Sequence, residues 1–158
     1  MASTFLVNPL DPTFIRQTII NGSRSAHPDT ASVVRFIDGE DSTAVLWGFK
    51  LTGGTGTKWP DSHSPGTFRE GGGILAQDAS PTIRFNLITG NVATNVAGCV
   101  SAGGSGVRVD GGRPWLLNNV IADNQGRYGA GVVVNFSGAV LRNNLNYGQP
   151  GWAGLWGR

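Results

Sequence analysis

Short apolar runs separated by turn-forming residues recur along the chain. The runs are three to five residues long and rich in Val and Ile, and Gly, Asn or Pro interrupts them every few positions. An amphipathic helix of about ten residues does not fit this spacing, whereas short β-strands joined by tight turns do. The pattern therefore predicts an all-β chain.

Three segments of the chain, 73–91, 106–124 and 131–145, align with one another. In each segment an apolar residue is followed nine positions later by a second apolar residue, and three positions after that by an asparagine. The positions are Ile74, Ile83 and Asn86, then Val107, Leu116 and Asn119, then Val132, Leu141 and Asn144. The internal spacing is constant while the joins between segments vary in length, which is typical of a solenoid with loop insertions.

The repeat predicts a parallel β-helix, a solenoid of about four to five stacked coils, because each coil buries too little apolar surface alone. We expect the solenoid to span residues 18–146, after an N-terminal lead-in, 1–17, and before a C-terminal tail, 147–158. Equivalent residues then lie about 4.8 Å apart along the stack. Asn86, Asn119 and Asn144 are expected to form an inward ladder of amide hydrogen bonds at one corner.

Composition supports a folded chain with many tight turns. The 158 residues include 25 glycines, and only 14% of them are charged, which argues against disorder. The net charge is +2 and the arginines are scattered, so we expect no nucleic-acid partner. No apolar stretch is long enough to span a membrane, and no signal peptide is visible, which leaves the localisation open. The single Cys99 excludes an intrachain disulfide.

Three motifs carry a resemblance to a known family. The stretches GGGI (71–74), SPTIRFNLITGN (80–91) and LNNVIADN (117–124) resemble the right-handed parallel β-helix repeat proteins of the pectin-lyase-like superfamily. The resemblance covers roughly residues 18–146 and implies a right-handed parallel β-helix. That superfamily includes polysaccharide lyases, hydrolases and epimerases, and surface proteins without a known reaction. No arginine of this chain matches the catalytic arginine of pectate-lyase-like enzymes, and Asn146 stands where an inward Ile is expected.

The variable joins suggest a binding site. Residues 22–31, 55–71 and 92–104 all connect the last strand of one coil to the first strand of the next, so they emerge at the same corner. Aromatic rings beside carboxylates and Arg suit sugar recognition. The candidate binding residues there are Trp59, Asp61, His63, Arg69, Glu70 and His27. The alternative is that these joins are ordinary surface loops.

A second corner carries acidic residues. Asp38 lies four residues after Val34 and Asp78 four after Ile74, so the two carboxylates should stack in register and form a candidate Ca²⁺ site. The alternative is a simple turn, since Asp38-Gly39 is a common turn dipeptide. No other metal or cofactor is expected.

These features leave two classes of function open. One is a non-catalytic β-helix module that binds carbohydrate, or that associates end to end with other copies because its last coil exposes strand edges. In that case Trp152 and Trp156 either cover the open end or offer an aromatic surface to a partner. The other is a polysaccharide lyase or hydrolase. A cluster of three acids with an Arg within about 5 Å would favour the enzyme.

Overall fold

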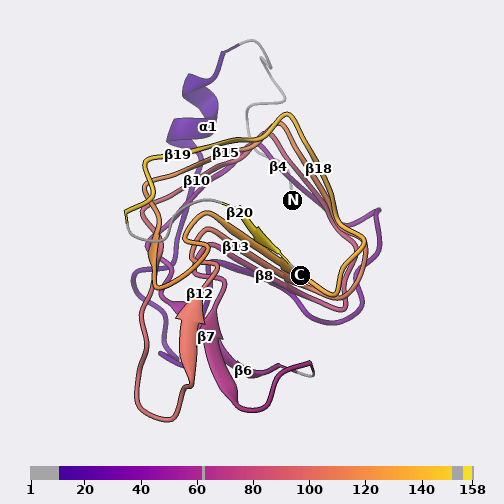
Figure 1. The fold of residues 1–158 in the computed structure, drawn as a ribbon. Helices are drawn as coiled ribbons and strands as arrows, with labels where there is room; N and C mark the ends of the chain where they lie inside the picture. Colours follow the sequence, from indigo (N-terminus) through magenta and orange to yellow (C-terminus); the bar gives the residue numbers. More distant parts are fainter. Residues whose placement is uncertain (1–10, 62, 151–154, 158) are drawn as a thin grey trace.

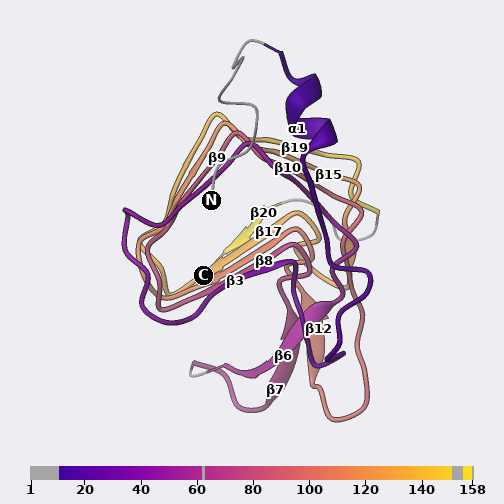
Figure 2. The same ribbon diagram turned by 180° about the vertical axis from the view of Figure 1, so that it is seen from behind.

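The computed structural model describes residues 11–61, 63–150 and 155–157 of the chain. The described part is all-β apart from one short helix, α1 (Thr13–Gln17), which stands beside the first strand (Figure 1, Figure 2). No helix in this part is long and apolar enough to cross a membrane. The prediction of an all-β chain is confirmed.

Most strands belong to three parallel sheets that surround a single apolar core. The first sheet runs in the order β1 (Ile19–Asn21), β5 (Lys50–Thr52), β10 (Leu87–Thr89), β15 (Val120–Ala122) and β19 (Leu145–Tyr147). The second contains β4 (Val45–Trp47), β9 (Thr82–Arg84), β14 (Trp115–Leu117) and β18 (Val140–Arg142). The third contains β3 (Val34–Phe36), β8 (Ile74–Gln77), β13 (Val107–Asp110), β17 (Val132–Asn135) and β20 (Leu155–Gly157).

The register of these sheets follows the spacing in the sequence. Ile74 pairs with Val107 and Val107 with Val132 in the third sheet. In the second sheet the matching partners are Ile83, Leu116 and Leu141. Their side chains fill the core, together with the inward residues of the first sheet such as Leu51, Ile88 and Ile121.

The three variable joins form a fourth sheet outside this core. It runs β12 (Ser101–Gly103), β7 (Thr67–Glu70), β6 (Gly56–Pro60) and β2 (Thr30–Ala31), and each join supplies at least one of these strands. Strand β6 is antiparallel to both β2 and β7. Two further short strands, β11 (Val92–Ala93) and β16 (Gln125–Gly126), pair in parallel nearby. The joins therefore meet at one corner, as expected, but they form paired strands instead of loops. We call this four-stranded unit the side sheet.

The expected asparagine ladder is present. Asn86 Nδ2 donates to Asn119 Oδ1 at 3.1 Å, and Asn119 Nδ2 donates to Asn144 Oδ1 at 3.0 Å. Each backbone amide donates to the same oxygen, and each Nδ2 also reaches a strand carbonyl, such as Leu46 O for Asn86. Every polar atom of the buried Asn86 and Asn119 amides is thus used.

A second ladder of the same kind lies at the next corner. Asn91 Nδ2 donates to Asn124 Oδ1 at 3.0 Å, and the backbone amide of Asn124 donates to Gln149 Oε1 at 2.8 Å. Gln149 Nε2 in turn donates to Asn146 Oδ1 at 2.9 Å. Asn146 pairs with Ile121, so the column of apolar side chains in the first sheet ends on a polar residue that is hydrogen-bonded.

Within the predicted tail, β20 pairs in parallel with β17 and places Trp156 opposite Val133 along the backbone. Trp152 lies outside the described residues. End-to-end association of copies of the chain stays a prediction.

Glycines allow successive turns of chain to approach closely where the joins return to the third sheet. A Cβ on Gly106 would lie 2.4 Å from the carbonyl oxygen of Gly131, and one on Gly73 would lie 2.5 Å from that of Gly106. Contacts this short with backbone cannot be relieved by a side-chain rotation. Any other residue would therefore push neighbouring turns apart at this glycine corner.

Candidate functional site

The side sheet covers the outer face of β13. Side chains alternate along a strand, so Val107 and Val109 face the core while Arg108 and Asp110 face outward. The hairpin of β6 and β7 lies across this face, and Arg108 and Asp110 are both 0% exposed as a result. A buried guanidinium requires partners, because an unpaired charge in a protein interior is very costly.

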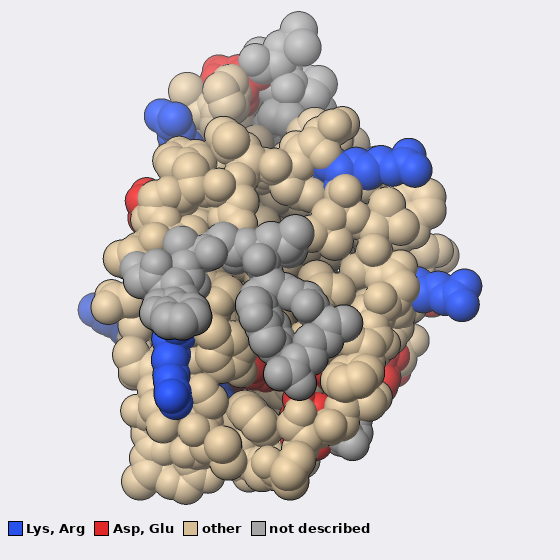
Figure 3. All heavy atoms as spheres, viewed as in Figure 1, with Lys and Arg blue, Asp and Glu red and all other residues tan. Residues whose placement is uncertain are grey.

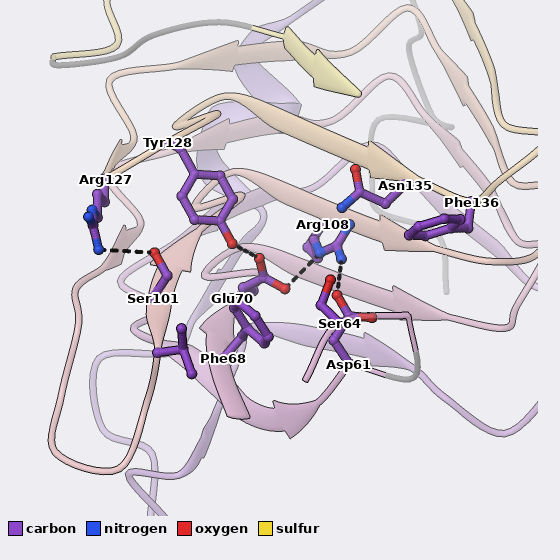
Figure 4. Close-up of a pocket in the computed structure, with 11 residues that line it drawn as sticks. Asp61, Ser64, Phe68, Glu70, Ser101, Arg108, Arg127, Tyr128, Asn135 and Phe136 are labelled. Carbon is purple, nitrogen blue, oxygen red and sulfur yellow. Dashed lines mark hydrogen bonds and ion pairs between the residues drawn. The ribbon is translucent and has the colours of Figure 1, made fainter. Parts of the chain in front are cut away.

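Arg108 finds those partners in three carboxylates from different parts of the chain. Its Nε donates to Glu70 Oε2 at 2.7 Å, and its Nη2 donates to Asp61 Oδ2 at 3.3 Å (Figure 4). The same Nη2 also donates to Asp110 Oδ1 at 3.0 Å. Its Nη1 donates to the carbonyl oxygen of Val109 at 2.9 Å. The guanidinium therefore ties the hairpin, through Asp61 and Glu70, to the central strand β13.

Glu70 is held by donors on both of its oxygens. Tyr128 donates its hydroxyl to Oε1, while Trp59 Nε1 donates to Oε2 at 3.0 Å beside the bond from Arg108. Burial and the nearby Glu70 carboxylate raise the pKa of Tyr128 well above its usual range. The Tyr128 hydroxyl thus keeps its proton and remains a donor to Glu70.

His63 links two of the acids at the edge of the cluster. Its Nδ1 lies 3.1 Å from Asp110 Oδ2 and 3.7 Å from Asp61 Oδ1, and its ring stacks on Phe136 at 3.9 Å between centroids. The His63 side chain is 33% exposed, in contrast to the acids. Burial raises the pKa of Asp110, and the Arg108 and His63 contacts offset only part of that effect. The Asp110 carboxyl can therefore hold a proton beside the partly exposed His63 ring.

An open pocket of ≈ 850 Å³ lies directly on this cluster. Its wall includes Asp61, Glu70 and Arg108, and the aromatic residues Phe68, Tyr128 and Phe136. Arg127, which is exposed, stands at one side and reaches Ser101 at 3.5 Å (Figure 4). The volume lies within the range of about 300–1,000 Å³ that is usual for small-molecule sites.

The structure brings four of the six predicted binding residues together, namely Trp59, Asp61, His63 and Glu70. Trp59 is only 4% exposed, however, so its ring supports Glu70 and does not offer a face to a sugar. Arg69 alternates with Glu70 along β7 and turns away, donating to Thr55 O at 2.8 Å. His27 lies on an exposed turn. Of the six predicted residues, Asp61 and Glu70 line the pocket, and Trp59, His63, Arg69 and His27 do not.

The predicted acidic corner, Asp38 and Asp78, is exposed, in contrast to the buried acids around Arg108. Asp78 has a positive φ of 48° that is typical of a turn. Among the described residues, the group of three side chains that could together ligate a metal is Asp61, His63 and Asp110, with one ligand atom of each within 4.8 Å of the others. The Arg108 guanidinium already supplies the positive charge there. Ca²⁺ at Asp38 and Asp78 stays a prediction.

The spacing of residues did not predict a role for Arg108, the residue at the centre of the cluster, although the sequence contains a signal for it. The equivalent outward positions on the neighbouring strands are Leu75 and Val133, both apolar and both buried. A row of apolar residues on the outer side of a sheet indicates that something covers it. Arg108 lies between these two apolar residues and is therefore expected to be buried and paired with an acid, whereas Arg35, at the same position on β3, is exposed.

The basic side chains elsewhere do not gather into one patch on the face of the molecule seen in Figure 3. Comparison with protein-family models, with curated proteins and with solved structures gives no significant match for this chain. What the site does has to come from the chemistry of its own residues.

Proposed function

We propose that the chain is a right-handed parallel β-helix of the pectin-lyase-like kind, and that it binds a carbohydrate in the pocket beside Arg108. The architecture is supported by the order of the strands, since each turn of chain contributes to the third, second and first parallel sheets in succession. The two amide ladders and the single core between the sheets support it further.

The observation that carries the binding proposal is the composition of the pocket wall. Phe68 and Phe136 provide apolar ring surface, and Phe136 is 50% exposed. Asp61 and Glu70 provide hydrogen-bond acceptors on the same wall. A sugar ring presents C–H groups on its faces and hydroxyls around its edge, so it needs both kinds of contact at once.

Array screening of immobilised glycans, followed by calorimetry with the best ligand, tests this proposal. Phe136→Ala is expected to weaken binding about tenfold, which corresponds to about 1.4 kcal/mol. Trp115→Ala is the matched control, because Trp115 is equally exposed at 50% but lies on β14, away from the pocket. Absence of any glycan ligand, or equal loss in both variants, would contradict the proposal.

Cleavage of the bound glycan is a second candidate, favoured by the three acids within 3.3 Å of one arginine. In such a hydrolysis the glycosidic C–O bond breaks and water forms the new bond to the sugar carbon. Asp61, which lines the pocket, accepts a proton from the attacking water, and Asp110, whose pKa is raised by burial, supplies the proton for the leaving oxygen through the His63 ring at the edge of the cluster. Release of new reducing ends that Asp61→Asn abolishes, measured at glycan concentrations that saturate the variant, would support cleavage; stable glycan over days would exclude it.

A further inference from the structure

The charges around Arg108 do not balance. Asp61, Glu70 and Asp110 each contact its guanidinium, so three carboxylates face one fixed cation. If either Asp110 or His63 carries a proton, one negative charge is still left over. Asp61 is 9% exposed and Glu70 1%, so water screens that charge weakly and its attraction for a cation is strong.

Resting on the proposed function, we propose that the preferred carbohydrate carries a free ammonium group, as a glucosamine unit does. The ammonium would bind beside Asp61, at the floor of the pocket that Asp61, Glu70 and Arg108 form. A uronate carboxylate, by contrast, would meet the same excess of negative charge and be repelled.

The hydrogen-bonding capacity of the floor agrees with this preference. Arg108 donates hydrogen bonds to the three acids and to Val109 O, and its side chain is 0% exposed. It is therefore poorly placed to bind an anionic ligand. Within the described ranges, Asp61 accepts one bond on each oxygen, from His63 N at 2.7 Å and from Arg108. A carboxylate can accept about four bonds, so about half of the capacity of Asp61 remains for an N–H donor.

The aromatic wall adds to the same preference. Phe68 and Tyr128 line the pocket beside the acids, and the faces of aromatic rings attract cations. Arg127 is exposed and lies beside Ser101, at the side of the pocket away from Asp61 (Figure 4), so its positive charge offsets the excess of negative charge only in part. An ammonium between the acids and the rings would satisfy both sets of groups.

Calorimetry with three tetramers tests the inference: glucosamine, N-acetylglucosamine and galacturonate. The first two differ at the nitrogen, which is a charged ammonium in glucosamine and a neutral acetamide in N-acetylglucosamine, and the Asp61→Asn variant below separates the effect of charge from that of the acetyl group. We expect the glucosamine tetramer to bind at least tenfold more tightly than the other two, and the preference to shrink as salt rises. Equal or tighter binding of either of the others overturns the inference while leaving the proposed function in place. Failure of all glycans to bind, on the array as well, instead removes the proposed function.

Two variants localise the effect. Asp61→Asn keeps the shape but removes the charge, and we expect it to bring the ratio between the two hexosamine tetramers close to one. Ser101→Lys adds a positive charge to the pocket wall without touching the cluster and should lower the ratio even if Asp61→Asn does not fold. Thr94→Lys, at an exposed position outside the wall, is the control. A ratio that Ser101→Lys leaves unchanged would overturn the inference.

Discussion

The molecule buries polar groups in two ways that differ in their chemistry. The asparagine ladders are neutral and periodic, and each amide in them meets a donor and an acceptor on the adjacent turns. The Arg108 cluster occurs once, is charged, and holds more acids than bases. The hydrogen-bonding groups of the ladder amides pair with one another and with the backbone, whereas the cluster retains a negative charge that a proton or a ligand can neutralise. A self-satisfied network supports structure, and an unbalanced one beside a pocket is suited to function.

Arg108→Met should have the largest effect, because it leaves three buried carboxylates without their cation. We expect the free energy of unfolding at pH 7 to fall by about 3–5 kcal/mol, measured by chemical denaturation. Arg84→Met is the matched control, since Arg84 is half-buried on the second sheet and stacks over Trp47 at 3.9 Å. Its loss should cost about 1 kcal/mol. Similar costs for the two variants would show that the cluster is an ordinary surface ion pair.

Asn119→Ala breaks the first ladder in its middle. The Asn86 amide loses its acceptor and Ile83 O loses its donor, so unfolding should become easier by about 2–3 kcal/mol. Asn144→Ala removes the same group from the partly buried end of the ladder and should cost about half as much. Glycan affinity should stay unchanged in both variants. A loss of binding in Asn119→Ala would mean that ladder and pocket are coupled.

Asp110 should make stability depend on pH in a recognisable direction. Its pKa is raised in the folded state, so between the unfolded value of about 3.9 and the raised value the folded protein binds the proton more tightly. Its contribution to stability is therefore greatest below this range and falls as pH rises through it. Asp110→Asn should flatten that fall in unfolding curves recorded from acid to neutral pH. An unchanged pH profile would place the proton elsewhere.

Tyr128→Phe should have the smallest effect, because it removes one neutral donor from a carboxylate that keeps two others. We expect a loss of about 1 kcal/mol in the free energy of unfolding. The comparison variant is Tyr147→Phe, which alters an exposed tyrosine on β19 and should be neutral. Thermal melting of the two variants side by side distinguishes them.

Spacing in the sequence was sufficient to predict the strand registers and the first ladder, because both depend on residues at constant intervals. The spacing did not predict the second ladder, because that ladder ends on Gln149, whose longer side chain takes the place of an asparagine. The location of the site was also predictable, since insertions meet where the turns of a stack coincide. The spacing does not predict how strands pair with one another inside an insertion. The antiparallel β6–β7 hairpin buries Trp59 and brings Glu70 to Arg108, and neither follows from interval alone.

The glycine corner separates two kinds of segment. The strands between corners must keep their length, whereas the joins that leave and return at the glycine corner can vary in length. Between corners, one added residue would shift a strand and turn its apolar side chains outward. At the corner, the chain leaves the stack near Gly54 and returns near Gly72, where a Cβ on Gly54 would lie within 1.9 Å of the Gly72 oxygen. Segments exchanged between those two points keep the registers of the three parallel sheets, provided that they again cover β13 and supply acids to Arg108. The same scaffold can therefore acquire pockets of new size and charge by replacing a single stretch of chain.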